Sequence, residues 1–156
     1  MTDPTRINVP VITPDVHRAM VAFGEIAEDK LDPVIVVLVK IRASQLNGCS
    51  FCLDLHTREA CTAGERERRL FTLAAWRETP LFNDRERAAL ALTEAVTFLT
   101  DGHVPDGVYQ MAAQHFNETE LAHLLWTIAA INAWNRMGVA TRLRPAVCEA
   151  SLASTL

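Results

Sequence analysis

Apolar residues recur along most of the chain at the spacing of helical faces, and helix-breaking residues separate the segments. Thr13-Pro14 has the form of a helix start, because proline fits the first helical position. The apolar stripe that follows consists of Val16, Met20, Phe23 and Ala27. These residues lie three or four positions apart, which predicts a helix over about 13–27.

The segment 34–41 is ambiguous by composition, because its β-branched residues would also suit a strand. Asp32-Pro33 repeats the helix start signal before it, and Asn47-Gly48 after it favours a left-handed helix ending. We therefore predict a helix over 33–47. Because this helix is apolar on nearly all sides, we expect it to be deeply buried.

Further start and stop signals predict helices over about 49–63, 65–75, 83–100, 104–115 and 117–138, and a short helix after Pro145. Asn83 with Glu86, and Asn117 with Glu120, have the spacing of capping boxes. Residues 76–82 are predicted to form a loop. The chain shows no internal strand pair, low-complexity segment or long linker, so we predict one domain over 1–156, an all-α bundle of about seven helices.

The length and net charge of the chain argue against some classes of function. A chain of 156 residues can bury a sizeable core without a metal ion or disulfide. The net charge of -4 argues against nucleic-acid binding, which needs clustered, uncompensated Lys and Arg. We find no run of about 20 apolar residues that would span a membrane and no signal-peptide core at residues 1–6, so we expect a cytoplasmic protein.

The segment 47–56 carries the densest chemistry in the chain. If a helix begins at Cys49, then Cys49, Cys52 and His56 lie three and four positions apart and share one helical face. Both thiols would lie in the first turn, where free backbone N–H groups and the helix dipole favour thiolate. Because the cytosol is reducing, a close pair among four cysteines points to catalysis or metal binding.

As a redox pair, one thiolate would attack an oxidant and the second thiol would condense with it to form a disulfide. We assign the attack to Cys52, because His56 lies one helical turn away and titrates near neutral pH, so that it can carry the proton. Cys49 is then the resolving cysteine, and we expect it at the less enclosed tip of the helix.

Two other interpretations of this motif stay open. Structural zinc needs four ligands, and Cys61, the next sulfur, lies about 120° around the helix from Cys49. Alternatively, the pair simply packs as small apolar groups beside a core histidine. A haem attachment site is excluded because Leu53, not histidine, follows the second cysteine. We expect no metal and no cofactor, and we expect Cys61 and Cys148 to be packing residues.

Glu94 and Arg136 are the other unusual polar residues. Glu94 lies within an otherwise apolar helix centre, where a carboxylate needs a partner or a raised pKa. A salt bridge and a proton-relay role near the thiols are both open for it. Arg136 either pairs with Glu94 or lines an opening to the thiols.

With these residues in view, the chain resembles the alkylhydroperoxidase D-like (AhpD-like) members of the carboxymuconolactone decarboxylase family. The resemblance extends over about 15–144 and rests on a Ser-Gln-x-Asn-Gly-Cys-x-x-Cys-x-x-x-His block at 44–56. It is supported by the segments 40–43, 74–80 and 131–136.

The resemblance implies an all-helical subunit that assembles into trimers or hexamers and acts as a peroxidase on organic hydroperoxides. By residue, Cys52 matches the peroxidatic cysteine, Cys49 its resolving partner and His56 the relay histidine. The implied electron donor is a dihydrolipoyl-bearing protein or another dithiol. The decarboxylase branch generally lacks the cysteine pair, so that activity is disfavoured.

The chain departs from the family pattern at the relay glutamate, which usually lies twelve residues before the first cysteine. Val37 occupies that position, so either another acid replaces it, with Glu94 and Asp54 as candidates, or hydroperoxide turnover is weak. Phe51 between the cysteines makes the site more apolar than in relatives with histidine there. The alternative function is a non-enzymatic, redox-responsive or ligand-binding oligomer.

Overall fold

The structure is a computed structural model that describes residues 5–146. This part of the chain contains eight α-helices, one 3-10 helix and no strand, which confirms the predicted all-α fold. The helices are α1 (Val9–Ile12), α2 (Pro14–Glu28), α3 (Pro33–Asn47), α4 (Ser50–Thr62), α5 (Glu67–Thr72), the 3-10 helix η1 (Leu73–Glu78), α6 (Asp84–Thr97), α7 (Asp106–His115) and α8 (Glu118–Thr141).

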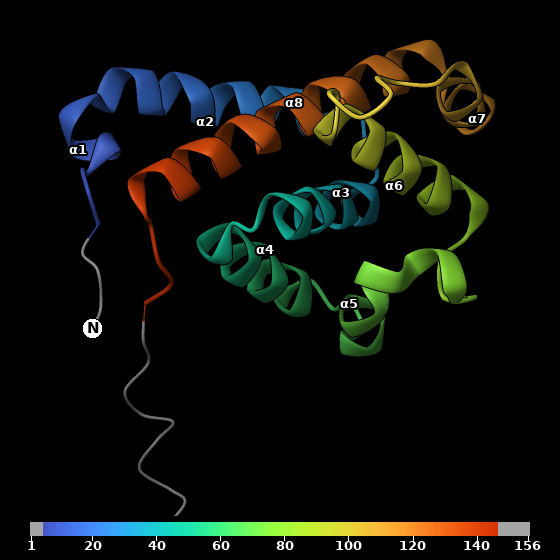
Figure 1. Cartoon of the computed structure of the whole chain (residues 1–156), viewed down its shortest axis with the longest axis horizontal. Helices are drawn as coiled ribbons and strands as arrows, with labels where there is room; N and C mark the ends of the chain where they lie inside the picture. Colours follow the sequence, from blue (N-terminus) through green and yellow to red (C-terminus); the bar gives the residue numbers. More distant parts are fainter. Residues whose placement is uncertain (1–4, 147–156) are drawn as a thin grey trace, which may run out of the picture.

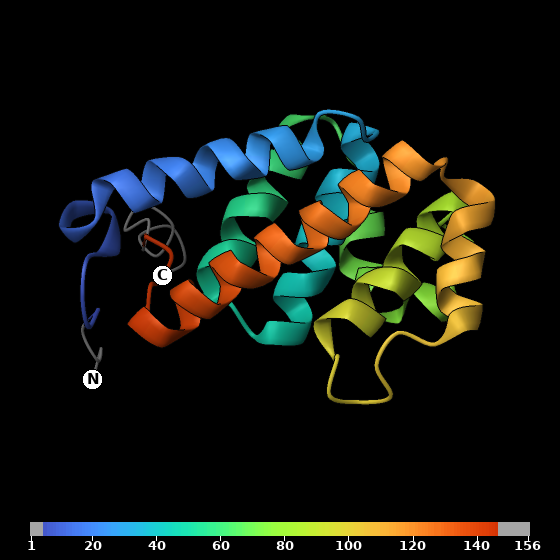
Figure 2. The ribbon, with the colours of Figure 1, turned by 90° about the horizontal axis from the view of Figure 1, so that it is seen from above.

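Helix α3 is the centre of the bundle and packs against α4, α6 and α8. Helix α8 crosses the molecule diagonally with α2 along one of its sides (Figure 2). Helices α1 and α7 lie at opposite ends of the molecule (Figure 1). Because α3 and α4 follow each other directly and both contact α8, residues from the two halves of the chain meet at the α3–α4 junction.

The predicted capping signals explain where α3, α6 and α8 begin. Asp32 accepts a hydrogen bond from Val34 N at 2.7 Å and caps α3, with Pro33 as its first residue. Both predicted capping boxes, those of α6 and α8, are present. The β-branched segment is therefore helical because its caps and its burial outweigh its intrinsic strand preference.

The core consists of two clusters that share α3. Ile35 and Val39 pack with residues of α6, α7 and α8, whereas Leu38 and Ile41 pack with residues of α4, α5, η1 and α6. An apolar helix buried on two sides has no polar face, which is why the sequence of α3 lacks the usual amphipathic pattern. The predicted deep burial of this helix is confirmed.

Several helix boundaries differ from the prediction. Helix α1 was not predicted, η1 occupies part of the predicted loop, and α6 ends at Thr97 rather than near Thr100. Helix α8 continues past Gly138 to Thr141, so the predicted stop at Gly138 is wrong. The helix predicted beyond Pro145 lies outside the described residues.

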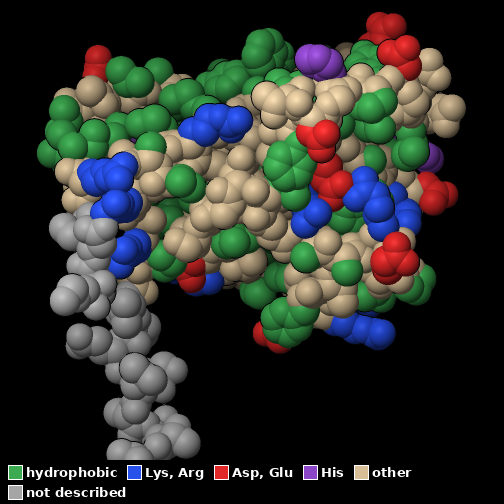
Figure 3. Space-filling model, viewed as in Figure 1, with side chains coloured by type: hydrophobic (Ala, Val, Ile, Leu, Met, Phe, Trp, Pro, Cys, Tyr) green, Lys and Arg blue, Asp and Glu red, His purple; other side chains and the backbone are tan. Residues whose placement is uncertain are grey.

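The surface of the described chain carries apolar side chains in addition to charged ones. Figure 3 shows hydrophobic side chains gathered over α1 and α2 along the upper edge of the molecule. The exposed large apolar residues of these two helices are Val11, Ile12, Val16, Val21 and Ile26. Among residues 5–146, no helix combines the length and apolar character needed to cross a membrane.

Candidate redox site

The junction of α3 and α4 places the two cysteines. Gly48 adopts the left-handed conformation predicted for it, with φ of 66°, and ends α3. Cys49 N then donates to Ser44 O at 3.1 Å, which closes the turn. Cys49 is itself the N-cap of α4, and its Sγ accepts a hydrogen bond from Cys52 N at 3.3 Å. The first helical turn therefore holds both sulfurs at the positive end of the helix dipole.

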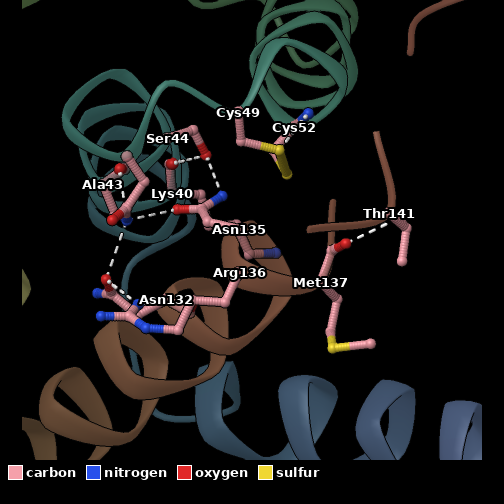
Figure 4. Close-up of a disulfide and its surroundings, with 11 residues drawn as sticks. Lys40, Ala43, Ser44, Cys49, Cys52, Asn132, Asn135, Arg136, Met137 and Thr141 are labelled. Atoms are coloured by element: carbon pink, nitrogen blue, oxygen red, sulfur yellow. Dashed lines mark hydrogen bonds between the residues drawn. A yellow bond between two sulfur atoms is a disulfide. The ribbon is translucent and has the colours of Figure 1, made fainter. Parts of the chain in front are cut away.

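Cys49 and Cys52 form a disulfide, with their Cα atoms 5.4 Å apart. The sulfurs point from α4 toward α8, between Asn135 and Thr141 (Figure 4). Cys49 is 1% exposed and Cys52 is 4% exposed. The prediction that Cys49 is the less enclosed of the two is therefore wrong, because α8 covers the helix tip.

Gly138 of α8 lies against the cysteine pair and was not recognised as part of the site from the sequence. A Cβ atom at Gly138 would lie 2.9 Å from Cys49 Sγ and 3.6 Å from Cys52 Sγ. A glycine in mid-helix destabilises the helix relative to alanine. The close approach of the sulfurs gives this glycine a steric reason, and a glycine within an otherwise good helical pattern was the available signal.

A network of amide and hydroxyl side chains joins α3 to α8 next to the disulfide. The Asn135 amide lies 2.9 Å from Ser44 Oγ and 3.0 Å from Asn47 Nδ2. Asn47 Nδ2 also donates to Asn132 Oδ1 at 2.9 Å. Because Ser44 and Asn135 are fully buried, these bonds fix the distance between α3 and α8 and with it the position of α8 over the sulfurs.

His56 lies one turn beyond Cys52 on the buried face of α4. Its Nδ1 is 2.8 Å from Glu59 Oε2. Burial lowers the pKa of His56 below its ordinary value of 6.5, and this effect outweighs the hydrogen bond to Glu59, which acts in the opposite direction. The imidazole is therefore neutral at pH 7 and can accept a proton.

Glu59 is the functional candidate that the sequence reasoning missed, although its i+3 spacing from His56 was visible. It also lines a cavity of about 590 Å³ between α3 and the second half of α4. Val37 and Lys40 of α3 and Glu28 of α2 line the same cavity, and Lys40 Nζ pairs with Glu28 Oε1 at 2.6 Å.

The two predicted relay candidates make other contacts. Glu94 Oε1 accepts hydrogen bonds from Arg42 Nε and Trp76 Nε1, both at 2.8 Å, and Glu94 also pairs with Arg77. Burial by itself would raise the pKa of Glu94, but the bonds from Trp76, Arg77 and Arg42 outweigh it and lower this pKa. The salt-bridge alternative for Glu94 is thus observed.

Asp54 pairs with Arg58 at 2.9 Å on the outer side of α4. Arg136 donates to Asn132 Oδ1 and to the Asn132 carbonyl, rather than to Glu94. A relay role for Glu94 or Asp54 stays a prediction that these bonds do not favour.

The structure also bears on the predictions for the two lone cysteines and for metal binding. Cys61 is exposed, so the prediction that it is a packing residue is wrong, and Cys148 lies outside the described residues. Within residues 5–146, no group of three or more His, Cys, Asp or Glu side chains is arranged to hold a metal ion.

Known sequences are similar to much of this chain. Residues 14–95 match the carboxymuconolactone decarboxylase family. The uncharacterized protein YdfG of Bacillus subtilis (strain 168) is 42% identical over 109 residues, which cover 70% of this chain and 74% of YdfG. The uncharacterized protein YnjA of Escherichia coli (strain K12) is 34% identical over 112 residues, 72% of this chain and 61% of YnjA, so the match spans less than two thirds of YnjA.

A solved structure extends the similarity to most of the chain. The crystal structure of ATU0492 from Agrobacterium tumefaciens matches with a TM-score of 0.89 and 34% sequence identity, and the match covers 92% of this chain and 99% of ATU0492. ATU0492 is a protein of unknown function for which a role as the antioxidant defence protein AhpD has been suggested.

Proposed function

This chain belongs to the carboxymuconolactone decarboxylase family as an AhpD-like member, and from this premise we propose that it is a thiol-dependent peroxidase that reduces organic hydroperoxides. The observation that carries the proposal is the cysteine pair in the first turn of α4, joined as a disulfide, with His56 one turn away. The antioxidant role suggested for ATU0492 agrees with this chemistry.

The proposed reaction begins with the reduced pair. His56 accepts the thiol proton of Cys52, and the Cys52 thiolate attacks one peroxide oxygen, so that the O–O bond breaks and Cys52 becomes a sulfenic acid. The alkoxide that leaves takes the proton from His56 and departs as an alcohol. Cys49 then attacks the Cys52 sulfur, the S–S bond forms, and the hydroxyl group leaves with the remaining thiol proton as water.

The site supports this assignment of roles in two ways. Cys52 lies in the first turn of α4, where the positive end of the helix dipole favours a thiolate. The lowered pKa of His56, caused mainly by burial, leaves its imidazole ring unprotonated and ready to act as the base. Cys49 is near enough to resolve the sulfenic acid because it forms the disulfide in this conformation.

The covered position of the sulfurs sets a requirement for this reaction. With Cys49 and Cys52 at 1% and 4% exposure, a hydroperoxide reaches the pair only if side chains around the first turn of α4 move aside. Phe51 is half-buried at this turn and is the nearest large side chain in sequence. The reduced pair is the state in which this opening must occur.

The decisive experiment counts thiols in the reduced protein before and after addition of cumene hydroperoxide. We expect the wild type to lose two thiols and to gain one disulfide between Cys49 and Cys52, as mapped by mass spectrometry. Cys52→Ser should lose this reaction while keeping its fold. A wild type that retains both thiols would reject the peroxidase assignment.

We also propose that a dithiol, such as a dihydrolipoyl-bearing protein, returns the disulfide to the reduced state. Two thiols of the donor become a disulfide as Cys49 and Cys52 regain their protons. Consumption of dihydrolipoamide in the presence of hydroperoxide tests this step separately from the first oxidation.

The proposed working form is a homo-oligomer, a trimer or a hexamer. The exposed apolar residues of α1 and α2 support assembly, because contiguous apolar surface on a subunit is typical of protein contacts. The mass in solution, measured by light scattering after size-exclusion chromatography, distinguishes monomer, trimer and hexamer.

A second candidate function is a non-enzymatic, redox-responsive scaffold. The low exposure of the sulfurs favours it, because a sealed disulfide can change the packing of α8 without turning over. A disulfide that forms stoichiometrically with peroxide, and that no dithiol donor reduces again, would support this function over the peroxidase.

A further inference from the structure

We propose that Glu59 is the positioning carboxylate of the redox site, which holds His56 in one tautomer and connects its buried ring to solvent. This inference rests on the proposed peroxidase function, because it assigns a residue to the proton path of that reaction. Glu59 acts through His56 and does not itself touch the reacting sulfurs.

The first observation is the bond between the two side chains. A carboxylate accepts hydrogen bonds, so the Glu59 Oε2 atom 2.8 Å from His56 Nδ1 requires the proton on Nδ1. In the neutral ring, Nε2 then carries the lone pair and is the nitrogen left to accept the Cys52 proton. A carboxylate that orients a catalytic imidazole in this way also stabilises the imidazolium that forms during proton transfer.

The second observation is the difference in exposure along this pair. The His56 side chain is 11% exposed, whereas the Glu59 side chain is 54% exposed. Glu59 also lines the cavity of about 590 Å³, together with Lys40 and Glu28. The carboxylate therefore spans the distance between a buried ring and a solvent-facing cavity, which is the placement that a proton path requires.

The third observation is the charge around the ring. The charged groups that act on His56 are Glu59 on its own helix, Lys40 on α3 and Glu28 on α2. Burial lowers the pKa of His56 most, and Lys40 lowers it further, whereas Glu59 and Glu28 raise it. Lys40 is paired with Glu28, so Glu59 is the group that opposes burial through a direct bond.

The test compares Glu59→Ala, Glu59→Asp and wild type in a single-turnover reaction of the reduced protein with cumene hydroperoxide. The loss of the Cys49 and Cys52 thiols is followed from pH 5 to pH 9. We expect Glu59→Ala to react about a hundredfold more slowly at pH 7, a loss at the lower end of general acid–base effects. Glu59→Asp keeps a carboxylate and should recover part of the rate.

The pH profile separates this role from a structural one. The rate should fall as His56 becomes protonated, and because Glu59 raises the pKa of His56, its removal should move this acid limb to lower pH. Glu67→Ala is the matched control, since Glu67 is an exposed carboxylate at the start of α5. It should leave both the rate and the acid limb unchanged.

A second measurement is independent of activity. Nitrogen NMR of the His56 ring should show the Nδ1–H tautomer in the wild type, and Glu59→Ala should lose this preference and titrate at lower pH. Equal rates and equal His56 titration in wild type and Glu59→Ala would overturn the inference. If the wild type does not react with hydroperoxide, the proposed function fails, and an unchanged His56 tautomer in Glu59→Ala would refute the positioning role as well.

Discussion

Gly138 and Cys49 lie so close that a methyl group on Gly138 would be 2.9 Å from the Cys49 sulfur. The two residues are 89 positions apart in the sequence. The absence of a side chain at Gly138 allows α8 to cover the disulfide. The redox site is therefore built by α4 and closed by α8.

Gly138→Ala should destabilise the oxidised protein. Alanine in a helix interior is normally more favourable than glycine by about 0.5–1 kcal/mol. Here the methyl group must displace the Cys49 sulfur or α8, and overpacking of this kind costs about 1–3 kcal/mol. We expect a net loss of about 1 kcal/mol and a fall in Tm of about 2–4 °C, measured by calorimetry of the oxidised form.

Gly24→Ala is the matched control for this substitution. Gly24 also lies within a long helix, α2, but a Cβ atom there would meet nothing within 4 Å. Its replacement should raise the free energy of unfolding by about 0.5–1 kcal/mol. If Gly138→Ala were equally stabilising, the sulfurs would have room to move and the steric role of Gly138 would be rejected.

The same glycine illustrates what the sequence could and could not predict. Glycine after an apolar helical segment usually marks a helix end, and on that basis the last helix was predicted to stop at Gly138. The helix instead ends at Thr141, and its C-cap Arg142 takes the left-handed conformation with φ of 58°. The contact with Cys49 is long-range in sequence, so no local rule reveals it.

Local sequence signals predicted the helices correctly where the interacting residues lie close together in the sequence. The N-cap Asp32, the ending at Gly48 and the two capping boxes fixed the positions of the helices because each involves residues within a few positions. The burial of Cys49 and Cys52 was not predictable in this way, because α8 provides the cover. Glu59 was visible at i+3 from His56, but such pairs are common on exposed helix faces.

Cys49→Ser should trap the first oxidised intermediate. Without the resolving thiol, the sulfenic acid formed at Cys52 cannot condense to the Cys49–Cys52 disulfide. After one equivalent of cumene hydroperoxide, dimedone should label Cys52, as detected by mass spectrometry of the peptide. Label on the remaining sulfur of a Cys52→Ser variant instead would show that Cys49 is the attacking residue and would reverse the assignment.

Thiol reactivity in the folded protein should follow exposure. In the reduced protein, iodoacetamide should modify the exposed Cys61 before it modifies Cys49 or Cys52, which are covered in the oxidised conformation. Peptide mass spectrometry at short reaction times resolves the three sites, and full denaturation should remove the difference. Labelling of Cys52 as fast as that of Cys61 would mean that reduction alone opens the site.

Glu94 should contribute to stability in a pH-dependent way. Bonds from Trp76, Arg77 and Arg42 lower the pKa of Glu94 in the folded state below 4.5, its value when unperturbed. The stabilisation is therefore present above the unfolded pKa and is lost as pH falls through the folded pKa. Glu94→Gln should lower the free energy of unfolding by about 1–3 kcal/mol at pH 7, a typical cost for hydrogen bonds to a charged group.

Urea denaturation at pH 7 and at a series of lower pH values measures this dependence. The difference between wild type and Glu94→Gln should shrink at the lower pH, because a protonated Glu94 resembles glutamine in charge and shape. The same variant also tests the relay role predicted for Glu94, since a purely structural carboxylate leaves the pH profile of Cys52 oxidation unchanged. The oxidation rate is measured at a lower temperature, at which Glu94→Gln is fully folded. A shift of the acid limb of its pH profile under these conditions would instead make Glu94 part of the proton path.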